Sequence, residues 1–250
     1  LLISSLCFIV PGCTMWDWDG TETSYPTITL STSHTTITEN SGTEVTITAT
    51  ASKTSTENIV VTLATTGTAT DAADYSTVDG TTITITALST TGTKTFTITD
   101  DSVYEDDETV IVAISAVSGG NATESGTQSV TVTITENESA PTITLATSDS
   151  SITENSSDTI TLTATASQIA DEDITVTLAT TGTGTSGTDY SAVDGTTITI
   201  TAGDTTGTKT FTLTDDSVYE GDETVIVAIS SVTNASESGT QSVTTTITEN

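Results

Sequence analysis

The sequence predicts an all-β fold made of two tandem β-sandwiches. Two observations support this prediction: the chain repeats itself once, and apolar residues alternate with polar ones along short segments. For example, VTLATTGTATDAADYSTVDGTTITITA (61–87) returns as VTLATTGTGTSGTDYSAVDGTTITITA (176–202). Asp74 matches Asp189, 115 positions later, and after the loop at 118–121 the offset falls to 113, so that Ile134 matches Ile247. The chain therefore holds two copies of one unit of about 110 residues.

Each copy contains short segments with β-branched residues at alternate positions. In the first copy these are EVTITATA (44–51), NIVVTLATT (58–66), TTITITA (81–87), KTFTITD (94–100), ETVIVAIS (108–115) and SVTVTIT (129–135). A period of two places Val, Ile and Phe on one face of a sheet and Thr on the other. Gly, Asp, Ser and Asn between the segments mark turns. About seven strands and no helical stretch in such a unit are typical of a β-sandwich.

The composition limits the partners that the protein can have. Thirty-four acidic residues against three lysines and no arginine give a net charge of −31. This charge excludes nucleic acid, whose binding requires basic side chains, and it argues against an anionic membrane surface. Cations are therefore the expected partners. The chain is nevertheless not a disordered acidic tail, because its hydrophobic residues, 33% of the total, lie in regular strand patterns.

The first residues have the character of an export signal. LLISSLCFIVPG is an apolar run of signal-peptide length that ends in small residues. VPGC, which ends at Cys13, resembles the lipobox of bacterial lipoproteins, in which the cysteine carries the lipid; a plain secretory signal is the alternative. We therefore expect an extracellular or cell-surface protein, with a possible lipid anchor in the outer membrane as its one membrane attachment. Cys7 is the other cysteine, so the body of the chain has no disulfide or thiolate site.

The repeat also predicts the domain boundaries. Residues 1–13 form the signal or lipobox-like segment, and 14–25 form an N-terminal linker or a strand donated to a neighbouring molecule. The first sandwich comprises 26–138 and the second 139–250, joined near ENESAP (136–141).

The acidic residues gather where strands end. DDSVYEDDE (100–108) places six carboxylates in nine residues directly after a strand, and DDSVYEGDE (215–223) repeats the pattern. Other acids belong to the ITEN segments or lie in the loops that end in DY. These positions carry no hydrophobic core residue, so several carboxylates can meet at one end of a sandwich. Carboxylates a few ångströms apart cannot all stay ionised unless a cation joins them. Simple solvation of each acidic turn is the alternative.

These motifs together resemble the Calx-β domain family of sodium–calcium exchangers, integrin β4 and bacterial surface proteins. The resemblance rests on Glu39, GTATDAADY (67–75), DDSVYEDDE and TVTITEN (131–137), and in the second copy on Glu154, GTGTSGTDY (182–190), DDSVYEGDE and TTTITEN (244–250). It implies an immunoglobulin-like sandwich with Ca²⁺ at one tip. The implied metal ligands are Glu39, Asp74, Asp100, Asp101, Glu105 and Glu136, and in the second copy Glu154, Asp189, Asp215, Asp216, Glu220 and Glu249. At the last strand, where calcium-binding members often carry a run of aspartates, this chain has ITEN.

The chemistry of the residues agrees with calcium. Ca²⁺ takes six to eight oxygen ligands from pliable loops, whereas transition metals prefer His and Cys. The one histidine, His34, lies in STSHTTIT (31–38), which reads as an exposed strand, so no Ser-His-Asp arrangement can form. We therefore expect a protein that is not an enzyme.

The main functional hypothesis is a calcium-binding structural or adhesive module of the cell surface. Because Glu136 precedes the start of the second copy, calcium bound there is expected to stiffen the repeat array. The expected partners are calcium ions and surface proteins, glycans or other copies of the chain. The alternative is a subunit of an extracellular filament that polymerises by β-strand addition, in which residues 14–30 supply the donated strand. Calcium is optional in that alternative.

Overall fold

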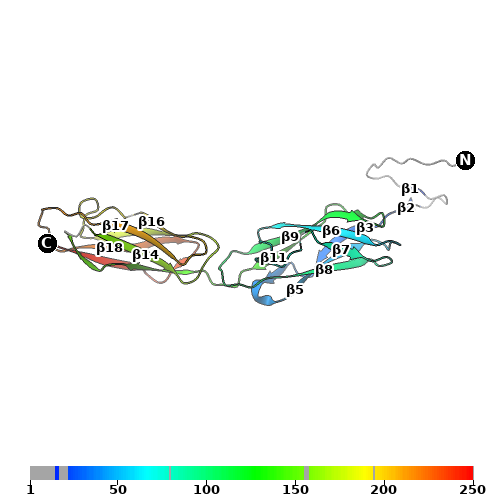
Figure 1. The fold of residues 1–250 in the computed structure, drawn as a ribbon, viewed down its shortest axis with the longest axis horizontal. Helices are drawn as coiled ribbons and strands as arrows, with labels where there is room; N and C mark the ends of the chain where they lie inside the picture. The colour runs from blue at the N-terminus through cyan, green and yellow to red at the C-terminus, as the bar shows by residue number, and fades with distance from the viewer. Residues whose placement is uncertain (1–14, 17–21, 79, 155–157, 194, 250) are drawn as a thin grey trace. The chain divides into compact units, whose positions relative to one another are not determined.

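A computed structural model describes residues 15–16, 22–78, 80–154, 158–193 and 195–249 (Figure 1). The chain forms two compact units. Unit 1 comprises residues up to 100 together with 107–135, and unit 2 comprises 101–106 together with 136–250. Cys13 lies outside the described residues. In the part of the chain that is described, no helix is long and apolar enough to cross a membrane.

Unit 1 is a sandwich of a four-stranded and a five-stranded sheet. The first sheet has the order β10-β3-β5-β8, formed by β3 (Thr27–Thr32), β5 (Glu44–Ala51), β8 (Thr91–Thr97) and β10 (Thr123–Glu124). The second has the order β4-β11-β9-β6-β7, formed by β4 (Thr36–Thr38), β6 (Ile59–Gly67), β7 (Thr82–Ile85), β9 (Glu108–Ser118) and β11 (Ser129–Thr135). A short 3-10 helix, η1 (Glu39–Ser41), follows β4, and two short antiparallel strands, β1 (Met15–Trp16) and β2 (Glu22–Thr23), pair with each other.

Unit 2 repeats this architecture. One sheet has the order β17-β14-β12-β19, formed by β12 (Thr142–Thr147), β14 (Thr159–Ala166), β17 (Thr206–Thr212) and β19 (Ser236–Glu237). The other has the order β13-β20-β18-β15-β16, formed by β13 (Ser151–Thr153), β15 (Ile174–Gly182), β16 (Thr197–Ile200), β18 (Glu223–Thr233) and β20 (Ser242–Thr248).

The cores follow the alternation in the sequence. Along β5, Val45 and Ile47 are buried while Thr46 and Thr48 lie on the outer face. On that face Thr46 and Thr48 stand beside Thr95 and Thr93 of β8 respectively. Threonine suits this role because its branched Cβ favours strands while its hydroxyl remains accessible to water.

The predicted all-β fold of two tandem sandwiches is confirmed, and two local details differ. The run TITLSTSHTTIT (27–38) forms two strands: β3 pairs with β5 in one sheet, and β4 pairs with β11 in the other. His34 lies in the bend where the chain changes sheets, and not in an exposed strand as the sequence predicts. Because Thr27–Thr32 pair within unit 1, part of the predicted donor segment 14–30 already has a place in its own sheet.

Candidate metal centre

A close backbone approach at Gly182 fixes the loop that carries Asp189. Gly182 ends β15 with a φ of 126°, and a Cβ atom there would lie 2.1 Å from the carbonyl oxygen of Thr224. The same oxygen accepts hydrogen bonds from the N–H groups of Thr183 (3.0 Å) and Gly184 (3.1 Å). The loop is thereby fastened to the start of β18, which carries Glu223 as its first residue. A glycine in the β15 sequence thus brings two distant acidic residues together.

Asp189 itself is held by hydrogen bonds and by the residue that follows it. Its side chain is only 5% exposed, and its Oδ2 accepts a hydrogen bond from the N–H of Thr185 at 2.5 Å. Its backbone oxygen accepts another from Thr214 at 2.8 Å. The ring of Tyr190 packs edge-on against Phe211 in the core, with 5.9 Å between centroids. The DY pair therefore joins a buried aromatic anchor to a buried carboxylate.

Glu154 reaches the same end of the sandwich through parallel strand pairing. β13 runs parallel to β20, with Thr153 opposite Thr248. Since parallel strands end at the same edge of a sheet, the residues that follow them, Glu154 and Glu249, leave the sheet together. Glu154 is 6% exposed.

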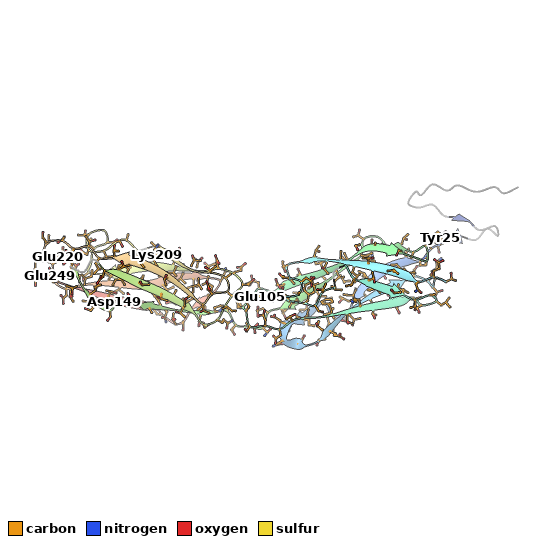
Figure 2. The ribbon with its side chains drawn as sticks, in the orientation of Figure 1. Tyr25, Glu105, Asp149, Lys209, Glu220 and Glu249 are labelled. Carbon is orange, nitrogen blue, oxygen red and sulfur yellow. The ribbon has the colours of Figure 1, made fainter. Side chains whose placement is uncertain are left out.

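The segment 215–223 supplies the remaining acids. Asp216 Oδ1 accepts a hydrogen bond from the N–H of Val218 at 2.6 Å, which closes a tight turn. Glu249 Oε2 accepts hydrogen bonds from the N–H groups of Glu220 and Gly221, both at 3.0 Å. Glu220 and Glu249 accordingly lie beside each other at one end of unit 2 (Figure 2).

Two groups of carboxylates result, and both lie wholly within unit 2. Oxygen atoms of Glu154, Asp216 and Glu220 lie within 4.8 Å of one another, and so do oxygen atoms of Asp189, Glu220 and Glu223. Glu220 belongs to both groups, and each group contains one nearly fully buried carboxylate. The arrangement offers only oxygen donors, at a spacing that a hard divalent ion can bridge.

The crowding of these groups changes their pKa values. Burial, a side-chain hydrogen bond with Asp189 and the negative charges nearby raise the pKa of Glu223 from 4.5 to about 7. Burial and the charges of Glu249 and Asp216 raise the pKa of Glu154. The pKa of Glu220 is also raised, because its carboxylate loses contact with water and is repelled by Asp189 and Asp216, although the side chain as a whole is exposed. The cluster therefore stays fully ionised at neutral pH only if positive charge enters it.

Comparison with known proteins identifies the family. The Calx-beta domain family matches residues 22–138 and 136–250. The chain belongs to the Calx-beta family. It carries two Calx-beta domains in tandem, and such domains are binding and regulatory modules rather than catalytic ones.

Several solved structures are similar to this Calx-beta protein. The crystal structure of CBD12 from CALX1.2 is 17% identical, covers 88% of this chain and 99% of its own, and has a TM-score of 0.40. The calcium binding domain CBD12 of CALX1.1 is 18% identical, with coverage of 78% and 76% and a TM-score of 0.37. The apo-form Calx CBD1 domain is 21% identical, with coverage of 45% and 99% and a TM-score of 0.36. Comparison with curated proteins found no match.

The first Calx-beta copy places its buried acids in the same way. Glu39 and Asp74 are buried, as their counterparts Glu154 and Asp189 are. Asp74 accepts a hydrogen bond from the N–H of Thr70, and Tyr75 packs against Phe96 with 5.8 Å between centroids. Asp74 and Glu108, both in unit 1, bring carboxylate oxygens within 4.8 Å of each other.

The other predicted ligands of the first copy divide between the units. Asp100 lies in unit 1, exposed, and Asp101, Glu105 and Glu136 lie in unit 2. Asp101 Oδ1 accepts a hydrogen bond from the N–H of Val103 at 2.7 Å. Glu136 Oε2 accepts one from the N–H of Glu105 at 2.6 Å.

The structure also identifies acids that sequence reasoning did not choose. Glu223 and its counterpart Glu108 begin β18 and β9, and the alternating pattern counts them as strand residues. The predicted ligand Asp215 is exposed and belongs to neither group in unit 2, although its charge acts on Glu154, as does that of Glu249. The signal that could have indicated Glu223 is its place at the first position of a strand, next to the acidic turn.

The raised pKa of Glu223 predicts that the metal-free protein loses stability as the pH rises. In the folded state Glu223 holds its proton up to about pH 7, whereas an unfolded chain releases it near 4.5. Between these values the folded state binds more protons, so the free energy of unfolding falls as the pH increases. We expect the melting temperature of metal-stripped protein to fall from pH 5 to pH 8, and Glu223→Gln to flatten that slope. A melting temperature that rises over this range would contradict the prediction.

Proposed function

We propose that this tandem Calx-beta protein is a non-catalytic calcium-binding structural module of the cell surface or extracellular space. The observation that carries the proposal is that Glu220 belongs to both groups of neighbouring carboxylates, and that each group contains one buried acid. A buried carboxylate normally has a positive partner. Lys53, Lys94 and Lys209 are the chain's only basic residues apart from His34, too few to neutralise 34 acidic residues, so we expect the positive charge to come from outside the chain.

The donor set favours calcium over other ions. The cluster in unit 2 is built from Asp and Glu on loops and strand ends, and such oxygen-only sites suit the larger and less demanding coordination of Ca²⁺. Mg²⁺ requires a tight octahedron, and transition metals favour nitrogen or sulfur ligands that this cluster lacks. In the bound state the ion would supply the positive charge that the cluster lacks, held by Glu154, Asp189, Asp216, Glu220 and Glu223.

Calorimetric titration of metal-stripped protein with calcium chloride tests the proposal. We expect saturable binding by the wild-type protein. Glu220→Gln should weaken binding to unit 2 at least about tenfold, because it removes a charged ligand from both groups. Asp204→Asn is the matched control. Asp204 is an exposed acid just before β17, at the opposite end of that strand from Asp215 and Asp216, so it lies away from the cluster. Equal affinities of the wild-type protein and Glu220→Gln would refute this site.

Calcium is further proposed to stiffen the chain around residues 136–141. Glu136 already orders this segment, because its Oε1 accepts hydrogen bonds from the N–H groups of Asn137 (2.7 Å) and Glu138 (2.6 Å). Burial raises the pKa of Glu136, but a side-chain hydrogen bond with Glu138 and the backbone hydrogen bonds outweigh burial and hold the pKa below its usual value, so the side chain is an anion. Small-angle scattering should show greater flexibility after chelation. Identical scattering curves with and without calcium would count against stiffening.

The proposed surface location includes anchoring through Cys13. The support is the lipobox-like VPGC sequence, and the net charge of −31 suits a solvated exterior protein. Metabolic labelling of the full-length protein with a radioactive fatty acid should mark the wild type and not Cys13→Ser. Equal labelling of both would contradict lipidation at this residue.

A further inference from the structure

Unit 2 contains the sequence SVYE twice, at 102–105 and at 217–220. The two segments are chemically identical, and both follow an aspartate whose side chain closes the same tight turn, onto Val103 in one case and Val218 in the other. Their surroundings differ, and the difference shows what the segment can bind.

The first segment is docked on the body of unit 2. The N–H of Tyr104 donates a hydrogen bond to the oxygen of Ile169 (3.1 Å), and the N–H of Asp171 donates one to the oxygen of Tyr104 (3.1 Å). Tyr104 thus forms a parallel β-bridge with Ala170, which is only 3% exposed, and its side chain packs against the core of unit 2. We call residues 169–171 the acceptor of this segment.

No such acceptor lies against the second segment in the described part of unit 2. Val218 is 56% exposed and Tyr219 is 84% exposed. Among the described residues, no hydrogen bond joins the backbone of Tyr219 to another group. Two adjacent exposed hydrophobic side chains, in a chain with a net charge of −31, offer a contact surface.

The first copy of the repeat carries an acceptor of the same construction. Thr54–Thr56 match 169–171, and both loops are closed alike: the oxygen of Ser55 accepts a hydrogen bond from Leu88 at 2.8 Å, as that of Ala170 does from Gly203. Thr54 and Thr56 are exposed. Within the described residues, the Thr54 oxygen and the Thr56 N–H make no hydrogen bond. The polar atoms that would receive a tyrosine backbone are therefore available.

We propose that Val218 and Tyr219 of one molecule dock on Thr54–Thr56 of a second copy of this chain. The Tyr219 N–H would donate to the Thr54 oxygen, and the Thr56 N–H would donate to the Tyr219 oxygen, as Tyr104 does with its acceptor. Charge favours this pairing, because the donor segment lies in the acidic run DDSVYEGDE and the acceptor of the first copy directly follows Lys53, one of three lysines in the chain. The acceptor of unit 2 follows the uncharged Gln168.

This contact differs from strand donation by residues 14–30 and does not depend on the proposed calcium site. Each molecule has one donor segment and one acceptor at different places, so the contact is heterologous and extends from molecule to molecule. An interface of one aromatic side chain and two backbone hydrogen bonds is small, which gives dissociation constants of about 0.1–1 mM.

Sedimentation equilibrium of the full-length chain tests the contact, in 0.15 M salt with millimolar calcium to reduce repulsion between molecules. We expect the weight-average mass of the wild type to rise with concentration beyond that of a dimer. Tyr219→Ala should remain monomeric, and so should Thr56→Pro, which lacks the N–H. An equimolar mixture of these two variants should stop at a dimer, because one supplies the donor and the other the acceptor.

Thr206→Ala, which shortens an exposed side chain in the same unit, serves as the control and should associate as the wild type does. Tyr219→Ala should also keep the calcium affinity of the wild type, which separates this contact from the metal site. A wild-type protein that stays monomeric at millimolar concentration would overturn the proposal, and so would a Tyr219→Ala variant that still associates. Failure of the mixture to form dimers, with both variants folded, would exclude Thr54–Thr56 as the acceptor.

Discussion

Millimolar calcium should raise the melting temperature of metal-stripped protein by about 10–20 °C. If the dissociation constant is about 10 μM, calcium at a hundred times that concentration stabilises the folded state by about 2.7 kcal/mol. For a domain of about 100 residues, each kcal/mol shifts the melting temperature by roughly 4–8 °C. Part of this stabilisation is relief of the repulsion that raises the pKa values of Glu154, Glu220 and Glu223 in the absence of metal.

Scanning calorimetry with a chelator, with calcium and with magnesium measures this effect. Magnesium at the same concentration should produce a much smaller shift, because the cluster does not impose an octahedral geometry. Glu154→Gln should reduce the calcium shift of unit 2 while raising the melting temperature of the metal-free protein, since it removes a buried negative charge. A melting temperature that calcium leaves unchanged would indicate that the acids are only solvated turn residues.

The strands and cores were predictable because one physical rule, alternation of β-branched residues, governs them. Val45 and Ile47 are buried where that rule places them. The change of sheet at Ser33–Thr35 was not predictable, because alternation says which face a side chain occupies and not which sheet the strand joins. It is this change that makes β4 parallel to β11, and the same change in unit 2 brings Glu154 beside Glu249.

The candidate site shows the same division between local and long-range information. The strand-end acids were visible as loop residues without a core position, whereas Glu223 reads as part of a strand and joins the site only through the approach of β15 to β18 at Gly182. The two SVYE segments give a stricter example. Their sequences are identical, yet Tyr104 is docked and Tyr219 is exposed, because the difference lies in what stands opposite each segment.

Gly182→Ala should destabilise unit 2 by on the order of 3–5 kcal/mol, one of the largest effects of any single added carbon in this chain. The new Cβ atom would lie 2.1 Å from the Thr224 oxygen, and a φ of 126° is a conformation that alanine rarely adopts. Relief requires β15 and β18 to separate, which breaks the hydrogen bonds from Thr183 and Gly184 and moves Asp189 away from Glu223.

Gly184→Ala is the matched control, two residues further along the same loop. Its Cβ atom would meet no atom closer than 3.5 Å, which is ordinary van der Waals contact, so we expect almost no change in stability. Calorimetry of Gly182→Ala should show one transition at a much lower temperature and one close to that of the wild type, because Gly67 still closes the equivalent loop of unit 1. Calcium should stabilise the weakened transition less than it stabilises unit 2 of the wild type, since the group of Asp189, Glu220 and Glu223 would be dispersed. If both transitions stayed in place, the glycine would not be what fastens this loop, and another contact would have to bring Asp189 to Glu223.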